Sequence, residues 1–381
     1  MLGLKELKST IKVTDTTVEC PVKGCREKVA RQREFFKRQE EFTCLKHGIY
    51  ISPSTFEYPN ELDNILWKEK ADLDLFERLK TVKRESRIAR DNSEDAVTWN
   101  VFRFLENNEL LSGLLARLSS SVVIKPEIIY WSYSQSEQDV WGPLQEAREE
   151  FEMRPRKGSE PDIIVKSDSA LFFVEAKLTA SNNTVFESTN PKVQKKYETS
   201  GDGWYKRVFR SNFETIAISE KKYELLRFWL IGSWIAERLQ LDFCLANLVL
   251  SEREKHIEKT FRKHIKENQR KKFARITWED IYAHILNSNS SSKDKDAMKR
   301  YFENKTVGYD ENGKIQKSIF VRASHRIRRR IVAPMTKNRE YRCEVCGKEI
   351  SEEEYESYDG LCWECWDDQM TEECEFEEDI I

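Results

Sequence analysis

The sequence lacks the apolar segments that export and membrane insertion require. No uncharged apolar run approaches the roughly 20 residues of a membrane helix. The first twenty residues contain no apolar core of signal-peptide length. We therefore expect a cytoplasmic protein with no membrane partner. The sequence also contains no internal repeat.

The sequence also lacks a large excess of either positive or negative charge. The chain of 381 residues carries 64 Lys and Arg against 67 Asp and Glu, which leaves a net charge of −3. A molecule with this balance is not a polycation, so any surface that binds nucleic acid must be a local patch. The length allows one large domain with appendages, or several domains.

A disulfide framework is not expected. Most of the nine cysteines stand at spacings typical of metal ligands, in a chain without an export signal, so reduced thiols are favoured. The C-terminal set has two CxxC pairs separated by fifteen residues. It resembles a zinc ribbon or treble clef, in which thiolates close a tetrahedral structural site. Its members are Cys343, Cys346, Cys362 and Cys365.

A second set of cysteines near the N-terminus is less regular. Cys20 and Cys25 are separated by four residues, and Cys44 is followed by His47. We predict that this set also binds zinc, so that two small modules, one at each end of the chain, hold two structural Zn²⁺ ions. Unrelated buried thiols are the alternative for both sets.

The middle of the sequence alternates between helical and strand-like segments. Capping residues, acids in the first turn and apolar residues at helical spacing predict a helix over 91–118. Strands are expected at 124–134, 161–167, 170–178, 241–250 and 273–278. Further helices are expected at 223–239, 256–268 and 279–286. This order predicts an α/β protein with a mixed sheet flanked by helices.

Acidic residues interrupt two of the predicted strands. With a two-residue turn at Asp168 and Ser169, residue numbers that face each other in the hairpin sum to 337. Asp162 then lies opposite Glu175, with Cβ atoms roughly 5 Å apart, and Lys177 points to the same face. A loop with an odd number of residues would shift the register and separate the two acids.

Two like charges that face each other on a sheet repel, so a purely structural pair is a poor explanation. Mg²⁺ or Mn²⁺ would resolve the repulsion, because such cations accept one or two carboxylates and keep waters and phosphate oxygens as further ligands. The alternative is that Asp162 and Glu175 are edge-strand charges facing solvent. Apolar residues on both faces of these strands argue against it.

The pair Pro161-Asp162 followed by Glu175-Ala176-Lys177 resembles the signature of the PD-(D/E)XK nuclease superfamily, and restriction-endonuclease-like members are the most similar. The resemblance implies an αβββαβ core, metal ligation by Asp162, Glu175 and the Ala176 carbonyl, and a water positioned by Lys177. In many members a preceding helix adds an acid, for which Glu94 is the candidate. Glu94 is equally explained by the helix macrodipole, which favours acids in a first turn.

The resemblance covers roughly residues 85–288. The expected organisation is an N-terminal zinc-ribbon-like module at 1–60, a charged connector at 61–84, the nuclease-like catalytic domain at 85–288, a solvated linker with a basic segment at 289–338, and a C-terminal four-cysteine zinc module with an acidic tail at 339–381.

Two segments are candidates for contact with nucleic acid. Residues 201–210 are expected to form a loop that interleaves aromatic and basic side chains, and 322–342 contains eight cations. The alternatives are a solvated loop with one buried Trp, and a basic segment that binds the acidic tail. The candidate residues are Trp204, Lys206, Arg207, Arg210, Arg328, Arg329 and Arg330.

The function these patterns favour is metal-dependent hydrolysis of phosphodiester bonds in nucleic acid, with DNA preferred over RNA. One rival is a nuclease-fold module without catalysis, which binds nucleic acid or a protein through its zinc modules. A zinc-dependent interaction protein with a middle domain that is only a scaffold is the other. A homodimer would suit double-strand cleavage, and the zinc modules are also candidate contacts for a protein partner.

Overall fold

The computed structural model describes residues 6–33, 38–83, 87–118, 123–155, 158–290, 292–317, 341–342 and 346–350. The chain divides into two compact units, residues 1–324 and 325–381. In the second unit, β15 (Tyr341–Arg342) pairs antiparallel with β16 (Glu349–Ile350).

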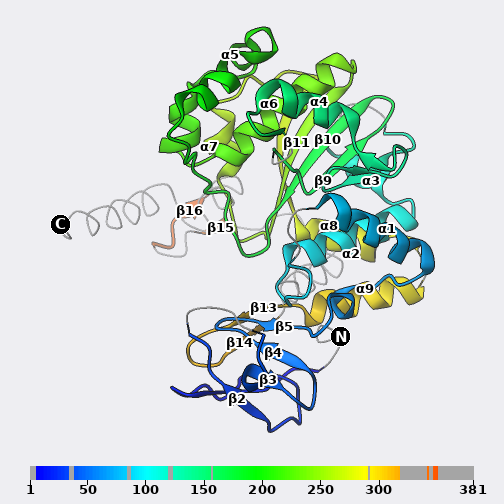
Figure 1. The fold of residues 1–381 in the computed structure, drawn as a ribbon, viewed down its shortest axis with the longest axis vertical. Coiled ribbons are helices and arrows are strands. Elements are labelled where there is room, and N and C mark those ends of the chain that lie inside the picture. Colours follow the sequence, from blue (N-terminus) through cyan, green and yellow to red (C-terminus); the bar gives the residue numbers. More distant parts are fainter. Residues whose placement is uncertain are drawn as a thin grey trace, which may run out of the picture. The chain divides into compact units, whose positions relative to one another are not determined.

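A mixed seven-stranded sheet forms the centre of the first unit (Figure 1). Its strand order is β12-β11-β10-β9-β6-β7-β8, with parallel pairing between β10, β11 and β12 and antiparallel pairing elsewhere. The predicted mixed α/β sheet is thereby confirmed. The strands are β6 (Glu127–Tyr130), β7 (Tyr133–Ser134), β8 (Asp139–Val140), β9 (Ile163–Lys166), β10 (Ala170–Ala176), β11 (Asp242–Val249) and β12 (Lys271–Thr277).

The hairpin of β9 and β10 has the predicted register. Lys166 pairs with Leu171 and Ile163 pairs with Val174, so facing residue numbers sum to 337. The Ser167 hydroxyl accepts a hydrogen bond from the Ala170 N–H at 3.0 Å and closes the two-residue turn. Continued by one residue, this register places Asp162 opposite Glu175.

Helices cover both faces of the sheet (Figure 1), and the residues of β10 are therefore buried on both sides. Phe172 and Val174 pack into the core on the side of α1 (Lys70–Val82), α2 (Glu94–Asn107) and α8 (Trp278–Leu286). Leu171 and Phe173 pack into a second core. The helices on that side are α4 (Gly142–Phe151), α5 (Pro191–Val208), α6 (Tyr223–Arg238) and α7 (Ile257–Arg262).

Capping side chains fix where helices begin. The Ser93 hydroxyl accepts the Ala96 N–H at the start of α2, and Thr277 and Asp280 form a capping box at α8. The single helix expected over 91–118 is instead two helices, α2 and α3 (Leu111–Leu115). Glu109 separates them with a φ of 55°, a left-handed conformation that a continuous helix does not allow.

The N-terminal module is built from short strands around its own apolar cluster. A hairpin from a distant part of the sequence contributes Tyr309 and Ile315 to that cluster. The elements are β1 (Thr17–Glu19), β2 (Lys28–Ala30), the 3-10 helix η2 (Glu40–Phe42), β3 (Thr43–Cys44), β4 (Ile49–Ile51), β5 (Phe56–Glu57), β13 (Thr306–Tyr309) and β14 (Ile315–Lys317).

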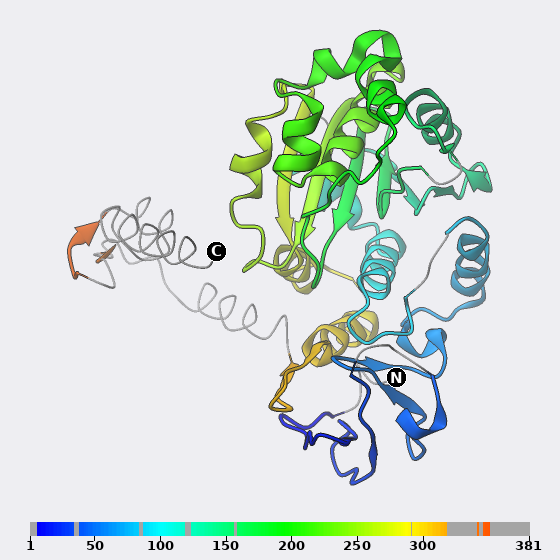
Figure 2. The same ribbon diagram turned by 60° about the vertical axis from the view of Figure 1, so that its left-hand side comes forward.

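Two predicted boundaries are corrected. The connector at 61–84 contains η3 (Glu61–Asn64) and α1, and α1 buries Leu75, Phe76 and Leu79 in the core of the sheet domain. The linker at 289–338 contains α9 (Ser292–Asn304) and the β13–β14 hairpin. Figure 2 shows α9 between the N-terminal strands and the sheet domain.

The expected loop at 201–210 is also corrected. Residues 204–208 are helical and form the last part of α5, whereas Ser200 to Gly203 are not helical, with positive φ angles at Gly201, Asp202 and Gly203. A Cβ atom at Gly201 would lie 2.7 Å from Phe151, so glycine permits both the backbone conformation and the packing there. After α5, a π-helix spans Thr215–Ser219. Among the residues described, no helix is long and apolar enough to cross a membrane.

Candidate active site and metal centre

Asp162, Glu175 and Lys177 lie together at the end of the β9–β10 hairpin. Glu175 pairs with Asn247 on β11, near the C-terminal end of that parallel strand. The side of the sheet that carries Leu171 and Phe173 also carries Glu175 and Lys177, because side chains alternate along a strand. The open end of parallel strands is where α/β sheets hold ligands.

Hydrogen bonds fix the two carboxylates in different ways. The Ala176 N–H donates to Asp162 Oδ2 at 2.9 Å, which ties the side chain of one strand to the backbone of the other. Lys177 Nζ lies 2.5 Å from Glu175 Oε1 and 2.9 Å from Glu224 Oε2. Glu175 is only 3% exposed, and its Oε2 receives no hydrogen bond from a described residue.

The site holds more negative charge than its neighbours compensate. Burial raises the pKa of Asp162 to about 7, against the opposing effect of Lys177 and Lys83. Burial, together with the carboxylates of Glu224 and Asp162, raises the pKa of Glu175 well above its usual value. Burial alone would lower the pKa of Lys177, but Glu175 and Glu224 raise it above its usual value. An added cation would relieve this excess.

These residues fit a hard divalent cation. Two carboxylates from adjacent strands and an unpartnered, buried carboxylate oxygen are the kind of donors that Mg²⁺ and Mn²⁺ accept. Among the described residues, no three acidic side chains bring ligand atoms within 4.8 Å of one another, so the carboxylates are not a closed cage. Mg²⁺ needs only one or two of them and takes its other ligands from water and phosphate. Ligation by the Ala176 carbonyl stays a prediction.

Glu94 contacts the turn that follows β10. Its Oε1 accepts backbone N–H groups from Leu178, Thr179 and Ala180 at 2.7, 3.0 and 3.1 Å. Glu94 therefore anchors the turn that directly follows Lys177. Its ligation of a metal stays a prediction.

A pocket of about 330 Å³ opens beside Glu94. Its wall includes Arg87 and Arg90 from the segment before α2, together with Thr179 and Ala180 from the turn after β10. Arginine side chains at such a place suit the phosphates of a nucleic-acid strand. The acids in this wall are partly compensated, since Asp95 lies 3.0 Å from Lys83.

Two further charged residues position the chain that leads to Asp162. Arg148 Nε and Nη2 donate to the Ser159 carbonyl at 2.8 and 2.6 Å. The Ser159 N–H and hydroxyl donate to Glu152 at 2.9 and 2.6 Å. A Cβ atom at Gly158 would lie 1.8 Å from Glu152 Oε2, so only glycine fits beside this pair.

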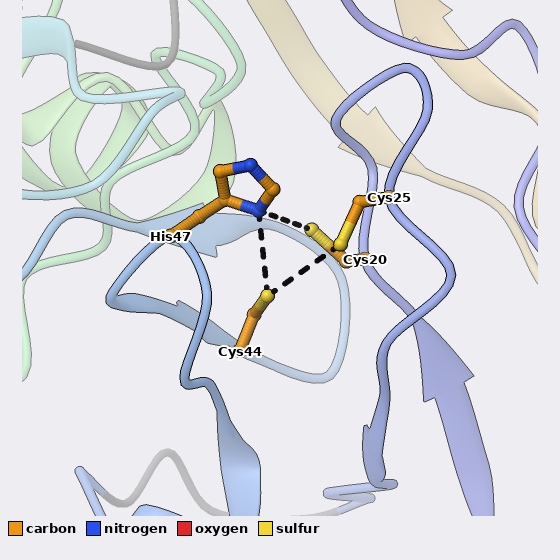
Figure 3. Close-up of side chains that lie close together, drawn as sticks. All are labelled: Cys20, Cys25, Cys44 and His47. Carbon is orange, nitrogen blue, oxygen red and sulfur yellow. Dashed lines mark hydrogen bonds between the residues drawn. The ribbon is translucent and has the colours of Figure 1, made fainter.

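The N-terminal cysteines and histidine form a compact cluster (Figure 3). The ligand atoms of Cys20, Cys25, Cys44 and His47 all lie within 4.8 Å of one another, so the cluster could hold a metal such as zinc. Gly24 and Gly48, with φ angles of 80° and 65°, lie in the two turns that carry these ligands.

The distances in this cluster match a zinc site. His47 Nδ1 lies 3.5 Å from the sulfurs of Cys20 and Cys44, and Cys25 Sγ lies 3.9 Å from Cys44 Sγ. Tetrahedral zinc with ordinary bond lengths separates nitrogen and sulfur by roughly 3.5 Å and two sulfurs by roughly 3.8 Å. Burial raises the pKa of the Cys20 and Cys44 thiols, so deprotonation there requires a cation.

The basic and aromatic residues of α5 are not beside the carboxylates. Trp204 is 4% exposed, and its indole N–H donates to Ser233 Oγ at 3.0 Å, so the expected stacking of Trp204 on a base is corrected to a core role. The Trp204 ring also contacts Lys271, at the start of β12. Glu175 pairs with Asn247 on β11, and Asn247 pairs with Arg275 on β12. Arg275 lies four residues, roughly 13 Å, beyond Lys271 along that strand.

The remaining cations of this segment, Lys206, Arg207 and Arg210, are exposed. Their contact with nucleic acid stays a prediction, at the end of the sheet away from the carboxylates. Several other predicted site residues lie outside the described residues. They are Cys343, Cys362, Cys365, Arg328, Arg329 and Arg330; Cys346 is described and exposed.

Sequence reasoning missed Glu224, Arg148 and Glu152. Glu224 stands in the first turn of an apolar helix, where the macrodipole already accounts for an acid. Arg148 and Glu152 have the spacing of an ordinary surface pair on a helix. Only tertiary packing reveals that both are buried, at 5% and 4% exposure.

No protein-family model matches the chain, and no significant match is found among curated proteins or among solved structures. The resemblance to PD-(D/E)XK nucleases therefore rests on the residues and the geometry described above.

Proposed function

We propose that this chain is a divalent-cation-dependent nuclease of the PD-(D/E)XK type, with DNA preferred over RNA as substrate. The observation that carries the proposal is the β9–β10 register, which continued by one residue places Asp162 opposite Glu175, together with the ion pair of Lys177 with Glu175 and a buried carboxylate oxygen left without a donor. A scaffold domain has no need of such an arrangement, because unpaired buried charge is costly.

The order of elements supports the proposal. The helix α2 is followed by β6, β9 and β10, then α6 and β11, with β10 and β11 parallel. Without α3, the small strands β7 and β8, α4, α5 and the π-helix at Thr215–Ser219, this order is similar to the αβββαβ core of the superfamily. The pocket beside Glu94, with Arg87 and Arg90 in its wall, would offer the substrate backbone a path to the turn that directly follows Lys177.

Asp162 and Glu175 would hold the cation, with Glu94 fixing the backbone turn beside them. A divalent cation supplies charge neutralisation at the scissile phosphate and lowers the pKa of an attacking water. Lys177 would orient that water and contribute positive charge near the developing phosphate charge. Arg148 and Glu152 hold the segment before Asp162 in place. The Asp162 carboxylate would therefore keep its position when the substrate binds.

We further propose that the N-terminal cluster binds Zn²⁺ and that this site is structural. Four protein ligands close a tetrahedral site and leave no position for substrate. The C-terminal cysteine set is proposed to bind a second Zn²⁺ in the same manner.

The test is cleavage of end-labelled DNA and RNA, single- and double-stranded, with and without added Mg²⁺ or Mn²⁺. We expect cation-dependent cleavage that falls by about 10²-fold or more in Glu175→Gln and Lys177→Met. Glu237→Gln is the matched control, since Glu237 lies on α6 and pairs with Lys271 at 2.7 Å, away from the site. Absence of cleavage under all these conditions, or equal cleavage by Glu175→Gln, contradicts the proposal.

A further inference from the structure

Glu224 is a charged residue of the site that belongs to none of the sequence motifs. It lies in the first turn of α6, and its backbone N–H donates to Thr184 Oγ1 at 2.8 Å. The segment around Thr184 also receives the Tyr223 N–H on its carbonyl, at 2.9 Å. The loop after β10 therefore fixes where the Glu224 side chain begins.

The Glu224 carboxylate points at Lys177 and not into solvent. Glu224 Oε2 lies 2.9 Å from Lys177 Nζ, and the Glu224 side chain is 21% exposed. Other acids in helix first turns are explained by the macrodipole and need no partner on another element. A contact that crosses from α6 to the end of β10 needs a different explanation.

Lys177 is shared between two carboxylates. Its ammonium lies 2.5 Å from Glu175 Oε1 and 2.9 Å from Glu224 Oε2, with only 13% of the Lys177 side chain exposed. Arg227, one turn along α6, lies 3.8 Å from Glu152. One ammonium is thus the direct cationic partner of both Glu175 and Glu224 in the described structure.

This sharing matters once a cation occupies Glu175. A divalent ion on Asp162 and Glu175 weakens the attraction between Glu175 and Lys177, because Glu175 then faces two competing cations. Without a second partner, the long lysine side chain would regain its rotamer freedom. Glu224 is the carboxylate already in place to keep the amine on the substrate side of the sheet.

We propose that Glu224 is the positioning residue for Lys177, holding its ammonium beside the cation site while the divalent ion engages Glu175. The inference rests on the proposed function for the role of Lys177, but the contact itself is independent of catalysis. Two rival explanations make different predictions. Glu224 as a direct metal ligand would control cation affinity, and Glu224 as a helix-start residue would affect only thermal stability.

The experiment follows the Lys177 ammonium directly, in full-length protein labelled with ¹⁵N-lysine and loaded with Ca²⁺ as a diamagnetic cation. A lysine NH₃⁺ group gives an observable ¹H–¹⁵N signal when burial and close ion pairs protect it from exchange with water. We expect such a signal in the wild type and in the control Glu237→Gln. It is assigned to Lys177 by its absence in Lys177→Met. We expect the Lys177 signal to be lost in Glu224→Gln and also in Glu224→Ala.

Ca²⁺ affinity and cleavage complete the test. Glu175→Gln should lose Ca²⁺ binding, whereas Glu224→Gln should keep it to within about tenfold and lower the maximal cleavage rate by about 10- to 100-fold. A Lys177 signal that persists in Ca²⁺-loaded Glu224→Gln, or that is missing from the Ca²⁺-loaded wild type, overturns the inference while the nuclease proposal stands. Loss of Ca²⁺ binding in Glu224→Gln assigns it as a ligand and also overturns it. Ca²⁺ binding that survives Glu175→Gln, or no binding by the wild type, contradicts the proposed function and the inference together.

Discussion

At the scale of residues, the candidate site is defined by charges that are buried before any substrate arrives. Glu175 and Glu224 share the positive charge of Lys177. Burial raises the pKa of Asp162, and burial together with the carboxylates of Glu224 and Asp162 raises the pKa of Glu175. Such an arrangement reduces the stability of the cation-free protein. It is the pattern expected where function and not folding selects the residue.

The loss of stability that buried charge causes in the cation-free protein can be measured at Asp162. Its pKa is raised to about 7, so the folded protein binds the Asp162 proton more tightly than the unfolded chain does. Stability therefore falls as pH rises from about 4 to about 7, and the full cost is present above pH 7. Asp162→Asn removes the titration but keeps a side-chain oxygen that can accept the Ala176 N–H.

We expect Asp162→Asn to be more stable than the wild type in urea unfolding at about pH 8 without divalent cations, by up to a few kcal/mol. Near pH 4 the two proteins should be equally stable, because Asp162 is then protonated in the folded wild type. Added Mn²⁺ should stabilise only the wild type. A variant less stable than the wild type at pH 8 would show that the Asp162 charge is satisfied within the protein.

At the scale of elements, the N-terminal cluster joins segments that are far apart in sequence. Cys20 and Cys25 stand in the turn between β1 and β2, and Cys44 and His47 stand around the turn between β3 and β4. The strands are two or three residues long, too short to be stable without a further constraint. A bound metal supplies that constraint, because its binding free energy contributes to folding.

Replacement of Cys44 by Ser should release this metal. We expect elemental analysis of Cys44→Ser to show about one zinc fewer per chain than the wild type, together with faster amide exchange in the N-terminal strands. Cys244→Ala is the matched control, since Cys244 is also a buried cysteine but packs in the sheet core. Equal zinc content in Cys44→Ser and the wild type would remove the cluster as a zinc site.

The elements also show what the sequence can and cannot predict. The β9–β10 register was predictable once a two-residue turn at Asp168 and Ser169 was assumed, and the structure has that register. The helix α9 was missed because polar residues dominate its sequence. Met298, Tyr301 and Phe302 nevertheless stand at helical spacing and are buried. Trp204 was misplaced because GDG predicts a loop, whereas the three residues only interrupt α5.

At the scale of the whole first unit, the chain returns to its beginning after the sheet domain. Thr306 donates to Asp91, which also accepts the Tyr58 hydroxyl, and Lys305 donates to Asn64. These contacts join the N-terminal module, the segment before α2 and the end of α9. Sequence reasoning could not find them, because each pairs residues between about thirty and more than two hundred positions apart without a local pattern.

Because of these contacts, the Glu94 pocket is built on packed elements and not on a free loop. Arg90 in the pocket wall lies 3.7 Å from Glu57 on β5, so the N-terminal module borders the Glu94 pocket. A substrate strand that follows the pocket would then reach the turn after β10, which directly follows Lys177. The central claim is that a divalent cation and a phosphate meet at these residues.

The most direct test of that claim is anomalous diffraction from crystals grown with Mn²⁺ and a DNA duplex whose phosphates are replaced by phosphorothioates. The account predicts an anomalous peak for manganese in contact with carboxylate oxygens of both Asp162 and Glu175 and with a backbone phosphate, and the Lys177 amine on the same side of the sheet. A manganese site elsewhere on the chain, or a DNA backbone that passes the protein without approaching these two carboxylates, would contradict it.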